Sequence, residues 1–295
     1  MSGQLRTLKN RIRSISSTKK ITRAMEMVSA SKLKRYQKMV QEGAPYAESL
    51  LNLLKRVSAT GVEATHPLLQ ARVEKKKALL VFTSDAGLAG SFNQDLIMTA
   101  TRFLKSEKET PLLIGIGKMG VTALKRSGLE FEKIFIETKT AEIENTITAI
   151  KNTVLELFMS KRVDAIYVTY SRFINASRFQ SVTEKLLPFT LDAVKKNSSP
   201  TEHAGVSVEE NYAMEPNAKT LFERLVPAVF SMRLRRIFLE SFVSEQMARM
   251  NAMHQATENA SELIDELVLE RNKARQAAIT KELIEIISGS KAMKA

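Results

Sequence analysis

The first part of the chain repeats apolar residues with the period of an amphipathic helix. No glycine or proline occurs from Gln4 to Glu42, and both residues disfavour the interior of a helix. The first apolar positions follow one another in steps of three and four, as in the seam of a coiled coil: Leu5, Leu8, Ile12 and Ile15. We predict that the seam shifts phase across residues 16–20 and then resumes with Ile21, Met25, Val28, Leu33, Tyr36 and Val40. Gly43 and Pro45 are predicted to end this helix before another helical piece over 46–59.

The last part of the chain carries a similar pattern over a greater length. After Pro227 there is no proline, and no glycine before Gly289, so one helix is predicted from Val229 to Ser288. At 1.5 Å per residue this helix would be about 90 Å long. Its seam is predicted at Met253, Ala256, Ala260, Leu263 and Leu267, with Ala274 and Ala277 later in the same frame. Because long amphipathic helices depend on packing for their stability, each terminal helix needs a partner.

The middle of the chain has the pattern of alternating strands and helices. Short runs rich in strand-forming residues are predicted as strands at 78–84, 111–117, 131–137 and 163–171, with a further strand after them in 171–189. Amphipathic segments are predicted as helices at 93–106, 118–127 and 141–160. This order predicts a mostly parallel sheet flanked by helices. Residues 195–205 have the composition of an exposed linker.

Together these elements predict an antiparallel coiled coil of the N- and C-terminal helices with an inserted Rossmann-like α/β domain. The expected parts are an N-terminal helix over 1–58, the α/β domain over 76–192, a linker or foot over 193–216, and the long C-terminal helix over 217–288. The C-terminal helix is expected to exceed its partner by roughly 20 residues, or about 30 Å. Its overhanging end would carry an apolar tip made of Ile279, Leu283, Ile284 and Ile287.

Charge and cysteine usage narrow the classes of function. The net charge is +13, and eleven basic residues against the single acid Glu26 lie between Met1 and Val40. This excess implies an acidic partner, and nucleic acid, an anionic membrane face and an acidic protein surface all fit it. The chain has no cysteine, which excludes disulfides, thiolate catalysis and cysteine metal sites. No apolar run has the length of a membrane span, and the start lacks a signal peptide, so we expect a protein of the cytosol or facing it.

Catalytic chemistry finds little support in the sequence. The glycine-bearing loop 83–93 lies between a strand and a helix, yet it matches neither the dinucleotide fingerprint nor the phosphate loop; Ser91 or Asn93 as a helix cap is the simpler interpretation. In 115–120, Gly-Lys is followed by methionine, so no hydroxyl is available for magnesium. The three histidines are scattered, and no Ser–His–Asp arrangement can be argued. We expect no enzyme activity, cofactor or metal in this chain.

Several long motifs, in order along the chain, resemble the gamma subunit of the F-type ATP synthase. They are "ITRAMEMVSASKLKRYQ" (21–37), "SDAGLAGSFN" (84–93), "EQMARMNAMHQATENASELI" (245–264) and "ARQAAITKELIEIISGS" (274–290). The last carries Ile279, Thr280, Glu282, Glu285 and Gly289 at the family's spacing. Ala86, Ala89 and Ser290 depart from residues that are common in the family.

The resemblance implies a role that periodicity does not. In that family the terminal helices form a rotating shaft inside a hexamer of alpha and beta subunits, and the α/β domain lies beside the epsilon subunit and the membrane ring of c subunits. Ion flow turns the ring and the shaft, ATP chemistry occurs in beta, and gamma binds no nucleotide. The 195–220 region here is short and free of cysteine, so a bacterial-type subunit at the cytoplasmic face of the plasma membrane is expected, without a membrane span of its own.

The resemblance also assigns residues to partners. Met25 with its basic neighbours Lys20 and Arg23 would face an acidic lever of beta, and Arg249 would be a further coupling position. The C-terminal contact with the hexamer would comprise Arg275, Gln276, Ile279, Thr280, Leu283 and Ile287. The foot on the c ring would include Tyr212 and Glu215.

Two other classes of function are compatible with parts of the sequence. A basic coiled-coil nucleic-acid-binding or scaffold protein would use the Lys/Arg-rich first helix and would bind with a steep dependence on salt. Aromatic residues are only 6% of this chain, however, and no nucleic-acid motif is present. The other alternative, an α/β enzyme with helical oligomerisation arms, is disfavoured by loops that carry no catalytic motif.

Overall fold

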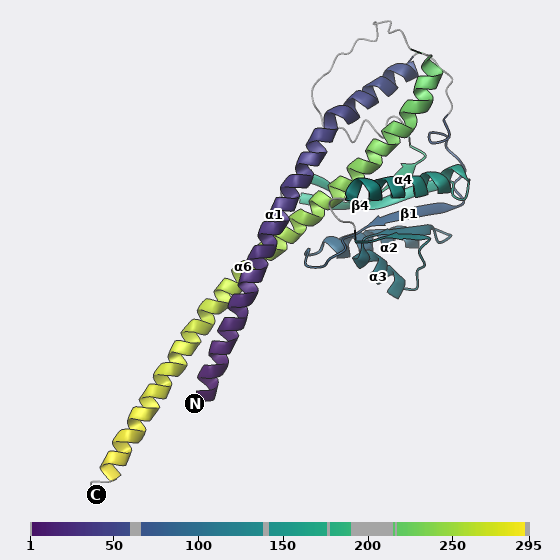
Figure 1. Ribbon diagram of the computed structural model, residues 1–295. Coiled ribbons are helices and arrows are strands. Elements are labelled where there is room, and N and C mark those ends of the chain that lie inside the picture. Colours follow the sequence, from purple (N-terminus) through teal and green to yellow (C-terminus); the bar gives the residue numbers. More distant parts are fainter. Residues whose placement is uncertain are drawn as a thin grey trace. The chain divides into compact units, whose positions relative to one another are not determined.

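The computed structural model describes residues 2–59, 66–137, 142–175, 178–189, 215 and 217–292 (Figure 1). The chain forms two compact units. One consists of residues 1–31 and 249–295, and the other of residues 32–248. The two longest helices, α1 (Ser2–Ala59) and α6 (Ala218–Ala292), each contribute to both units. Of the predicted linker over 193–216, the structure describes Glu215 alone, so the predicted foot residue Tyr212 lies outside the described residues.

The 32–248 unit is built on a five-stranded sheet in the order β3-β2-β1-β4-β5. The four strands β1 to β4 run parallel, and β5 pairs antiparallel with β4. The strands are β1 (Lys77–Phe82), β2 (Leu112–Ile116), β3 (Lys133–Phe135), β4 (Ala165–Asn175) and β5 (Arg178–Leu187). The mostly parallel sheet, including the further strand after β4, is confirmed.

Helices cover both faces of this sheet (Figure 1). The connecting helices are α2 (Phe92–Ser106), α3 (Lys118–Arg126) and α4 (Ile143–Met159). On one face a small core joins α2 and α3 to the sheet through Ala100, Leu124 and the strand residues Leu79, Val81 and Leu113. On the other face the main core joins the sheet to α4 and to the parts of α1 and α6 that belong to this unit, as in the group Leu54, Val154 and Phe238. The prediction of helices flanking an α/β sheet is confirmed.

The stretch of α6 in this unit also buries charged groups against β4 and β5. Arg233 donates from Nη2 to the carbonyl oxygen of Lys185 at 2.8 Å and lies 3.4 Å from the Glu184 carboxylate. One helical turn along, the Glu240 carboxylate lies 2.7 Å from Nε of Arg236. Burial raises the pKa of Glu240, because a desolvated carboxylate is costly to ionise and Arg236 offsets that cost only in part. The contacts of Arg233 thus join α6 to β5, while the Arg236–Glu240 pair lies within α6.

The predicted breaks at Gly43 and Pro45 and before Val229 are wrong, whereas the bounds 1–58 and 217–288 given for the two long helices lie close to the observed ones. The first helix continues through Gly43 and Pro45 to Ala59, and the last helix begins at Ala218 and continues through Pro227. A proline inside a helix costs about 3 kcal/mol because one backbone hydrogen bond is lost. Packing outweighs that cost here, since residues beyond each proline are buried in the main core: Leu50, Leu54 and Val57 on α1, and Phe222 and Val226 on α6.

Candidate functional site

In the unit of residues 1–31 and 249–295, α1 keeps one unbroken heptad pattern. Its fully or partly buried positions recur every seven residues in two rows: Leu5, Ile12, Lys19 and Glu26 in one, and Leu8, Ile15, Thr22 and Ser29 in the other. The predicted phase shift is therefore wrong. Ile21 and Val28 are 60% and 55% exposed, because the polar residues Thr22 and Ser29 occupy the seam positions beside them.

The α6 side of this unit has the same regular pattern. Among its fully or partly buried residues, one series at steps of three and four comprises Met253, Thr257, Ala260, Ile264, Leu267, Arg271, Ala274 and Ala278. Four of the predicted seam residues are confirmed: Met253, Ala260, Leu267 and Ala274. The predicted second row is one residue too early at Leu263 and Ala277, which are exposed, while the predicted Ala256 and its neighbour Thr257 are both half-buried. Thr257, Ile264, Arg271 and Ala278 hold those seam positions.

Three polar contacts connect α1 to α6 at the centre of this seam. Lys19 Nζ donates to Ser261 Oγ at 2.9 Å, and the hydroxyl oxygens of Thr22 and Thr257 lie 2.8 Å apart. Next along the seam, the Glu26 carboxylate lies 3.2 Å from Nδ1 of His254. Sequence reasoning missed these residues because they are polar, although the seven-residue repeat from Leu8 through Ile15 to Thr22 was a signal for them. Polar seam contacts specify register at a cost in stability.

The polar seam leaves apolar side chains on the outside of α1. Ile21, Met27 and Val28 are all more than half exposed. Among them stand the predicted beta contacts: Lys20 is exposed, Arg23 is exposed and pairs with Glu26 at 3.0 Å, and Met25 is half-buried. Exposed apolar residues rimmed by charge are typical of a surface that another protein covers. The structure thus brings the predicted N-terminal interface residues together on one segment of α1.

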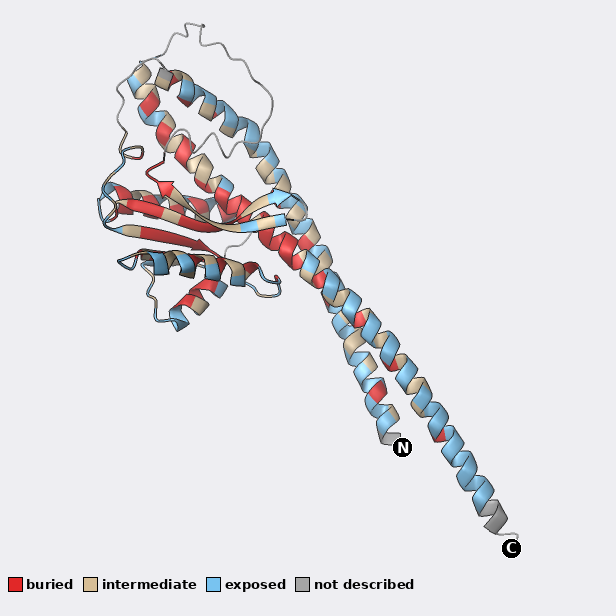
Figure 2. Cartoon of the chain, turned by 180° about the vertical axis from the view of Figure 1, so that it is seen from behind, coloured by how far each residue is buried: buried red, intermediate tan, exposed pale blue. Residues whose placement is uncertain are grey.

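The C-terminal end of α6 is exposed and apolar on several sides (Figure 2). Ile279, Leu283, Ile284, Ile286 and Ile287 are each at least half exposed. The polar members of the predicted contact, Arg275, Gln276 and Thr280, are exposed on the same helix end. Arg249, the further predicted coupling position, is buried, with 8% of its surface exposed. Glu215, a predicted foot residue, is exposed.

The contrast between Leu267 and Leu269 gives a direct test of the seam. Leu267 is 4% exposed and Leu269 is 63% exposed, only two residues apart on α6. Leu267→Ala should lower the free energy of unfolding by about 2–4 kcal/mol, because it removes a buried side chain and leaves a cavity. The matched variant Leu269→Ala should change it by less than about 0.5 kcal/mol. Urea unfolding followed by circular dichroism at 222 nm measures both, and equal losses in the two variants would refute the register.

The loop 83–93, which was considered as a phosphate site, uses its polar groups in hydrogen bonds within the chain. Asn93 Oδ1 accepts the Ser84 amide at 3.0 Å, and the Thr83 hydroxyl accepts the Gly120 amide at 2.9 Å. The N-cap of α2 is Ser91, without a side-chain cap, and its hydroxyl instead donates to Asp95 at 2.8 Å. Residues of the loop and the first turns of α2, namely Ala89, Phe92 and Leu96, pack against Ala248 of α6. Apolar packing therefore fills the place where parallel α/β sheets commonly bind a ligand.

Among the described residues, neither a metal-binding cluster nor a membrane-spanning helix is found. Within the described ranges, no group of three or more histidine or acidic side chains is arranged to hold a metal ion. Burial lowers the pKa of His66, whose Nδ1 accepts the Leu68 amide at 3.2 Å. Among the helices of the described part, none combines the length and the apolar character needed to cross a bilayer.

Known proteins match this chain over its whole length. It is 36% identical over 290 residues to the ATP synthase gamma chain of Pelotomaculum thermopropionicum, covering 98% of this chain and 99% of that one. It is 38% identical over 296 residues to the ATP synthase gamma chain of an Anaeromyxobacter species, with the same coverage. The family model described as ATP synthase matches residues 4–293. The chain belongs to the ATP synthase gamma-chain family.

The fold of this gamma-chain family member also has solved counterparts. A chain in the mitochondrial ATP synthase of Euglena gracilis, solved as an assembly of OSCP, F1 and c-ring, superposes with a TM-score of 0.66 at 18% identity, covering 99% of this chain and 95% of that one. A chain in the central stalk and c-ring of the Tetrahymena thermophila enzyme gives a TM-score of 0.59 at 24% identity, covering 80% and 99%. These likenesses confirm the fold of two long terminal helices with an inserted α/β sheet.

Proposed function

We propose that this chain is the central rotating shaft of an F-type ATP synthase. It would couple ion-driven rotation of the membrane c ring to ATP synthesis or hydrolysis at the beta subunits. Membership of the gamma-chain family supports this role. The observation that carries it is the exposed apolar surface of the helical pair, which has five large apolar residues on the last turns of α6 alone.

An exposed apolar helix end suits a part that turns inside another protein. Burying Ile279, Leu283 and Ile287 in a sleeve formed by the alpha and beta hexamer would remove apolar surface from water at about 25 cal/mol per Å². Apolar contact is not directional, so the tip can occupy several angular positions with similar energy. Arg275, Gln276 and Thr280, exposed beside it, would supply the few hydrogen bonds that distinguish one position from another.

The basic segment of α1 would carry the second contact with the hexamer. Lys20 and Arg23 stand beside Met25 and the exposed Ile21, Met27 and Val28. This surface matches an acidic, partly apolar lever of beta. Arg249 is buried within the chain, so its effect on coupling would come from positioning α6. The helix end at Ala218, with Tyr212 and Glu215 just before it in sequence, would contribute the foot on the c ring beside the epsilon subunit.

In this role the chain itself is not a catalyst. ATP would bind and react at beta, and the gamma chain would transmit only torque. It would lie at the cytoplasmic face of the bacterial plasma membrane as a peripheral part of the complex. The packed loop at Ser84 and Phe92 supports a chain that takes no nucleotide.

Reconstitution tests the proposal. The purified chain is mixed with alpha and beta subunits from the same source, and the assembly is analysed by native mass spectrometry and by ATP hydrolysis. We expect one copy of the chain per alpha and beta hexamer and a rate of hydrolysis that rises with its occupancy. A hexamer that never retains the chain would contradict the proposal.

Removing the apolar tip should affect assembly more than rotation. A chain that ends after Ala278 lacks Ile279, Leu283 and Ile287, so it should bind the hexamer at least about tenfold more weakly, which corresponds to about 1.4 kcal/mol. Complexes that do assemble should still turn, because the tip guides the shaft and does not drive it. The double variant Lys281→Ala/Glu285→Ala breaks only a solvent-exposed pair on the same helix end and serves as the control. Complete loss of torque in fully assembled complexes of the shortened chain would refute this account of the tip.

A further inference from the structure

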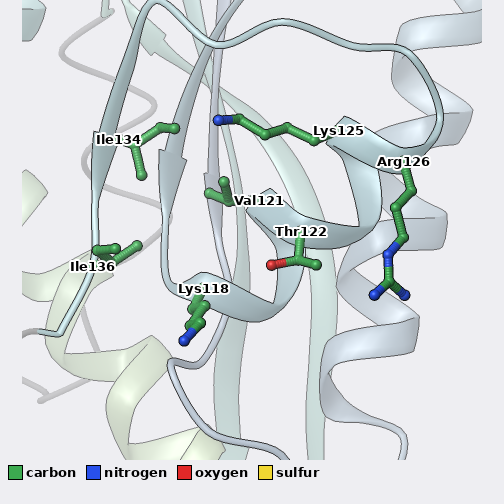
Figure 3. Close-up of a pocket in the computed structure, with 7 residues that line it drawn as sticks. All are labelled: Lys118, Val121, Thr122, Lys125, Arg126, Ile134 and Ile136. Atoms are coloured by element: carbon green, nitrogen blue, oxygen red, sulfur yellow. The ribbon is translucent and has the colours of Figure 1, made fainter.

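The α/β unit has a basic hollow at the edge of its sheet, on the face that carries α3. It encloses about 480 Å³ and is lined by Lys118, Val121, Thr122, Lys125, Arg126, Ile134 and Ile136. In Figure 3, Ile134 and Ile136 extend from the edge strand toward α3, with Val121 facing them. Lys118 and Lys125 stand at the two ends of this apolar floor, while Arg126 lies at the far side of the helix. The hollow is therefore an apolar groove with a cation at each end.

The cations of this hollow are not neutralised within the described chain. Some other basic side chains of the unit have acidic partners, such as Lys77 with Glu107 at 2.7 Å and Arg162 with Glu132 at 2.9 Å. In the described ranges, Lys118, Lys125 and Arg126 form no ion pair. A second basic hollow, at Lys75, Lys76 and Lys77, differs because Glu109 lies in its lining and Lys77 is paired. Of these two hollows in the described part of the chain, the α3 hollow combines unpaired cations with an apolar floor.

The apolar floor is also left without cover by the chain. Phe135, between the two isoleucines, packs on the main core, whereas Ile136 is 46% exposed. Ile134 lies in β3 and Ile136 follows directly after its last residue; β3 is the outermost strand in its sheet and is paired with β2 along one side. An unpaired strand edge is a template on which an extended segment of another chain can add as a further strand. Its alternate side chains would then enter the hollow between β3 and α3.

We propose that this groove is a docking site for an extended acidic segment of a partner protein, with an apolar side chain between two carboxylates. Lys118 and Lys125 are seven residues apart on a helix, which places them about 10 Å apart along its axis. In a strand, two carboxylates four residues apart are separated by about 13 Å and point to the same face, so flexible lysine side chains at both ends can reach them. The residue midway between them would place its apolar side chain on Val121, Ile134 and Ile136. This site is separate from the shaft surfaces and does not depend on the chain rotating.

A peptide series tests the groove on the full chain. The probe is a fluorescein-labelled peptide, Thr-Glu-Thr-Leu-Thr-Glu-Thr, titrated by fluorescence anisotropy at low salt. Two control peptides replace either the leucine by serine or both glutamates by glutamine. We expect saturable binding of the probe, at least about tenfold weaker binding of each control, and weaker binding as salt rises, because screening reduces the attraction between the charges.

Matched protein variants assign the binding to the groove. Lys118→Gln/Lys125→Gln should weaken binding of the probe at least about tenfold. Arg102→Gln/Lys105→Gln removes the same charge from exposed positions on α2 and should leave binding unchanged within about twofold; thermal unfolding checks that both variants fold. No saturable binding to the wild-type chain, equal losses in both variants, or equal binding of the serine peptide would overturn the proposal. Displacement of the probe by millimolar inorganic phosphate at constant ionic strength would also overturn it, because the groove would then be an anion site and not a peptide site.

Discussion

Phe238→Ala should lower the free energy of unfolding of the 32–248 unit by about 3–5 kcal/mol, the range for removing a fully buried phenylalanine. Phe238 has no exposed surface. Its ring lies edge-on to Phe82 of β1 at 5.5 Å between centroids, and tilted against Phe242 on α6 at 4.9 Å. Phe238 therefore joins α6 to the centre of the sheet. A neighbouring side chain could fill the space left by its removal only if α6 or the sheet moved.

The measurement can be confined to this unit. The chain has five tyrosines and no tryptophan, and every tyrosine falls within residues 32–248. Urea unfolding followed by near-ultraviolet circular dichroism of tyrosine thus reports on the unit that contains Phe238. Leu53→Ala, at a position that is 50% exposed on α1, is the control and should cost less than about 1 kcal/mol. A loss below about 1 kcal/mol for Phe238→Ala would show that α6 does not pack on the sheet as described.

Gly117→Ala should destabilise the same unit by roughly 2–5 kcal/mol, from two separate causes. Gly117 has φ +88, a left-handed conformation that costs other residues about 1–2 kcal/mol. A Cβ at this position would also lie 2.0 Å from the carbonyl oxygen of Thr83, and forced overpacking costs about 1–3 kcal/mol. The contact is between two backbones, at the ends of β1 and β2, so neither can move without disturbing the sheet.

Gly128 separates these two causes. Its φ is +81, similar to that of Gly117, but a Cβ there would meet nothing within 4 Å. Gly128→Ala should therefore show the conformational cost alone, about 1–2 kcal/mol. The difference between the two variants, measured by the same unfolding experiment, gives the combined effect of the close approach to Thr83 and of the ψ of 138 at Gly117. If the two variants lost equal stability, the tight junction between the loops after β1 and β2 would be refuted.

The sheet could be predicted from sequence because each strand and helix has its own local pattern. Strands β1, β2 and β4 are buried apolar runs, and α2, α3 and α4 are amphipathic with clear ends. The prolines could not be placed in the same way. Pro45 and Pro227 each lower the stability of the helix locally, and this effect can be read from the sequence. The packing that outweighs it, as at Leu54 and Val226, involves residues that are distant in the sequence.

The polar seam shows why the coiled coil was only partly predictable. Apolar residues marked the seam correctly at Leu8, Ile12 and Ile15, where burial and hydrophobicity agree. At Thr22 the partner is Thr257, 235 positions away. A polar residue that is satisfied by a distant polar residue leaves no apolar signal in its own helix. For that reason the apolar pattern predicts the neighbouring Ile21 in the seam, whereas Ile21 is part of the exposed surface that the proposed function uses.

The candidate site was predictable to a similar extent. The exposed, apolar end of α6 could be predicted, because a run of apolar residues there extends beyond the end of its partner helix. The burial of Arg249 had no local signal, because an arginine on a helix is usually solvated. Which partner meets Met25, Arg275 or Thr280 rests on the family resemblance and stays a prediction.

Observation of rotation in single complexes tests the central claim most directly. Because the chain has no cysteine, Lys108→Cys, at an exposed position after α2, provides a unique attachment point for a bead, while the alpha and beta hexamer is fixed to a surface. On addition of ATP we expect the bead to turn continuously in one direction, in regular steps, and to stop when ATP is removed. A hexamer that retains the chain and hydrolyses ATP while the bead shows only random fluctuation would contradict the claim that this chain is a rotating shaft.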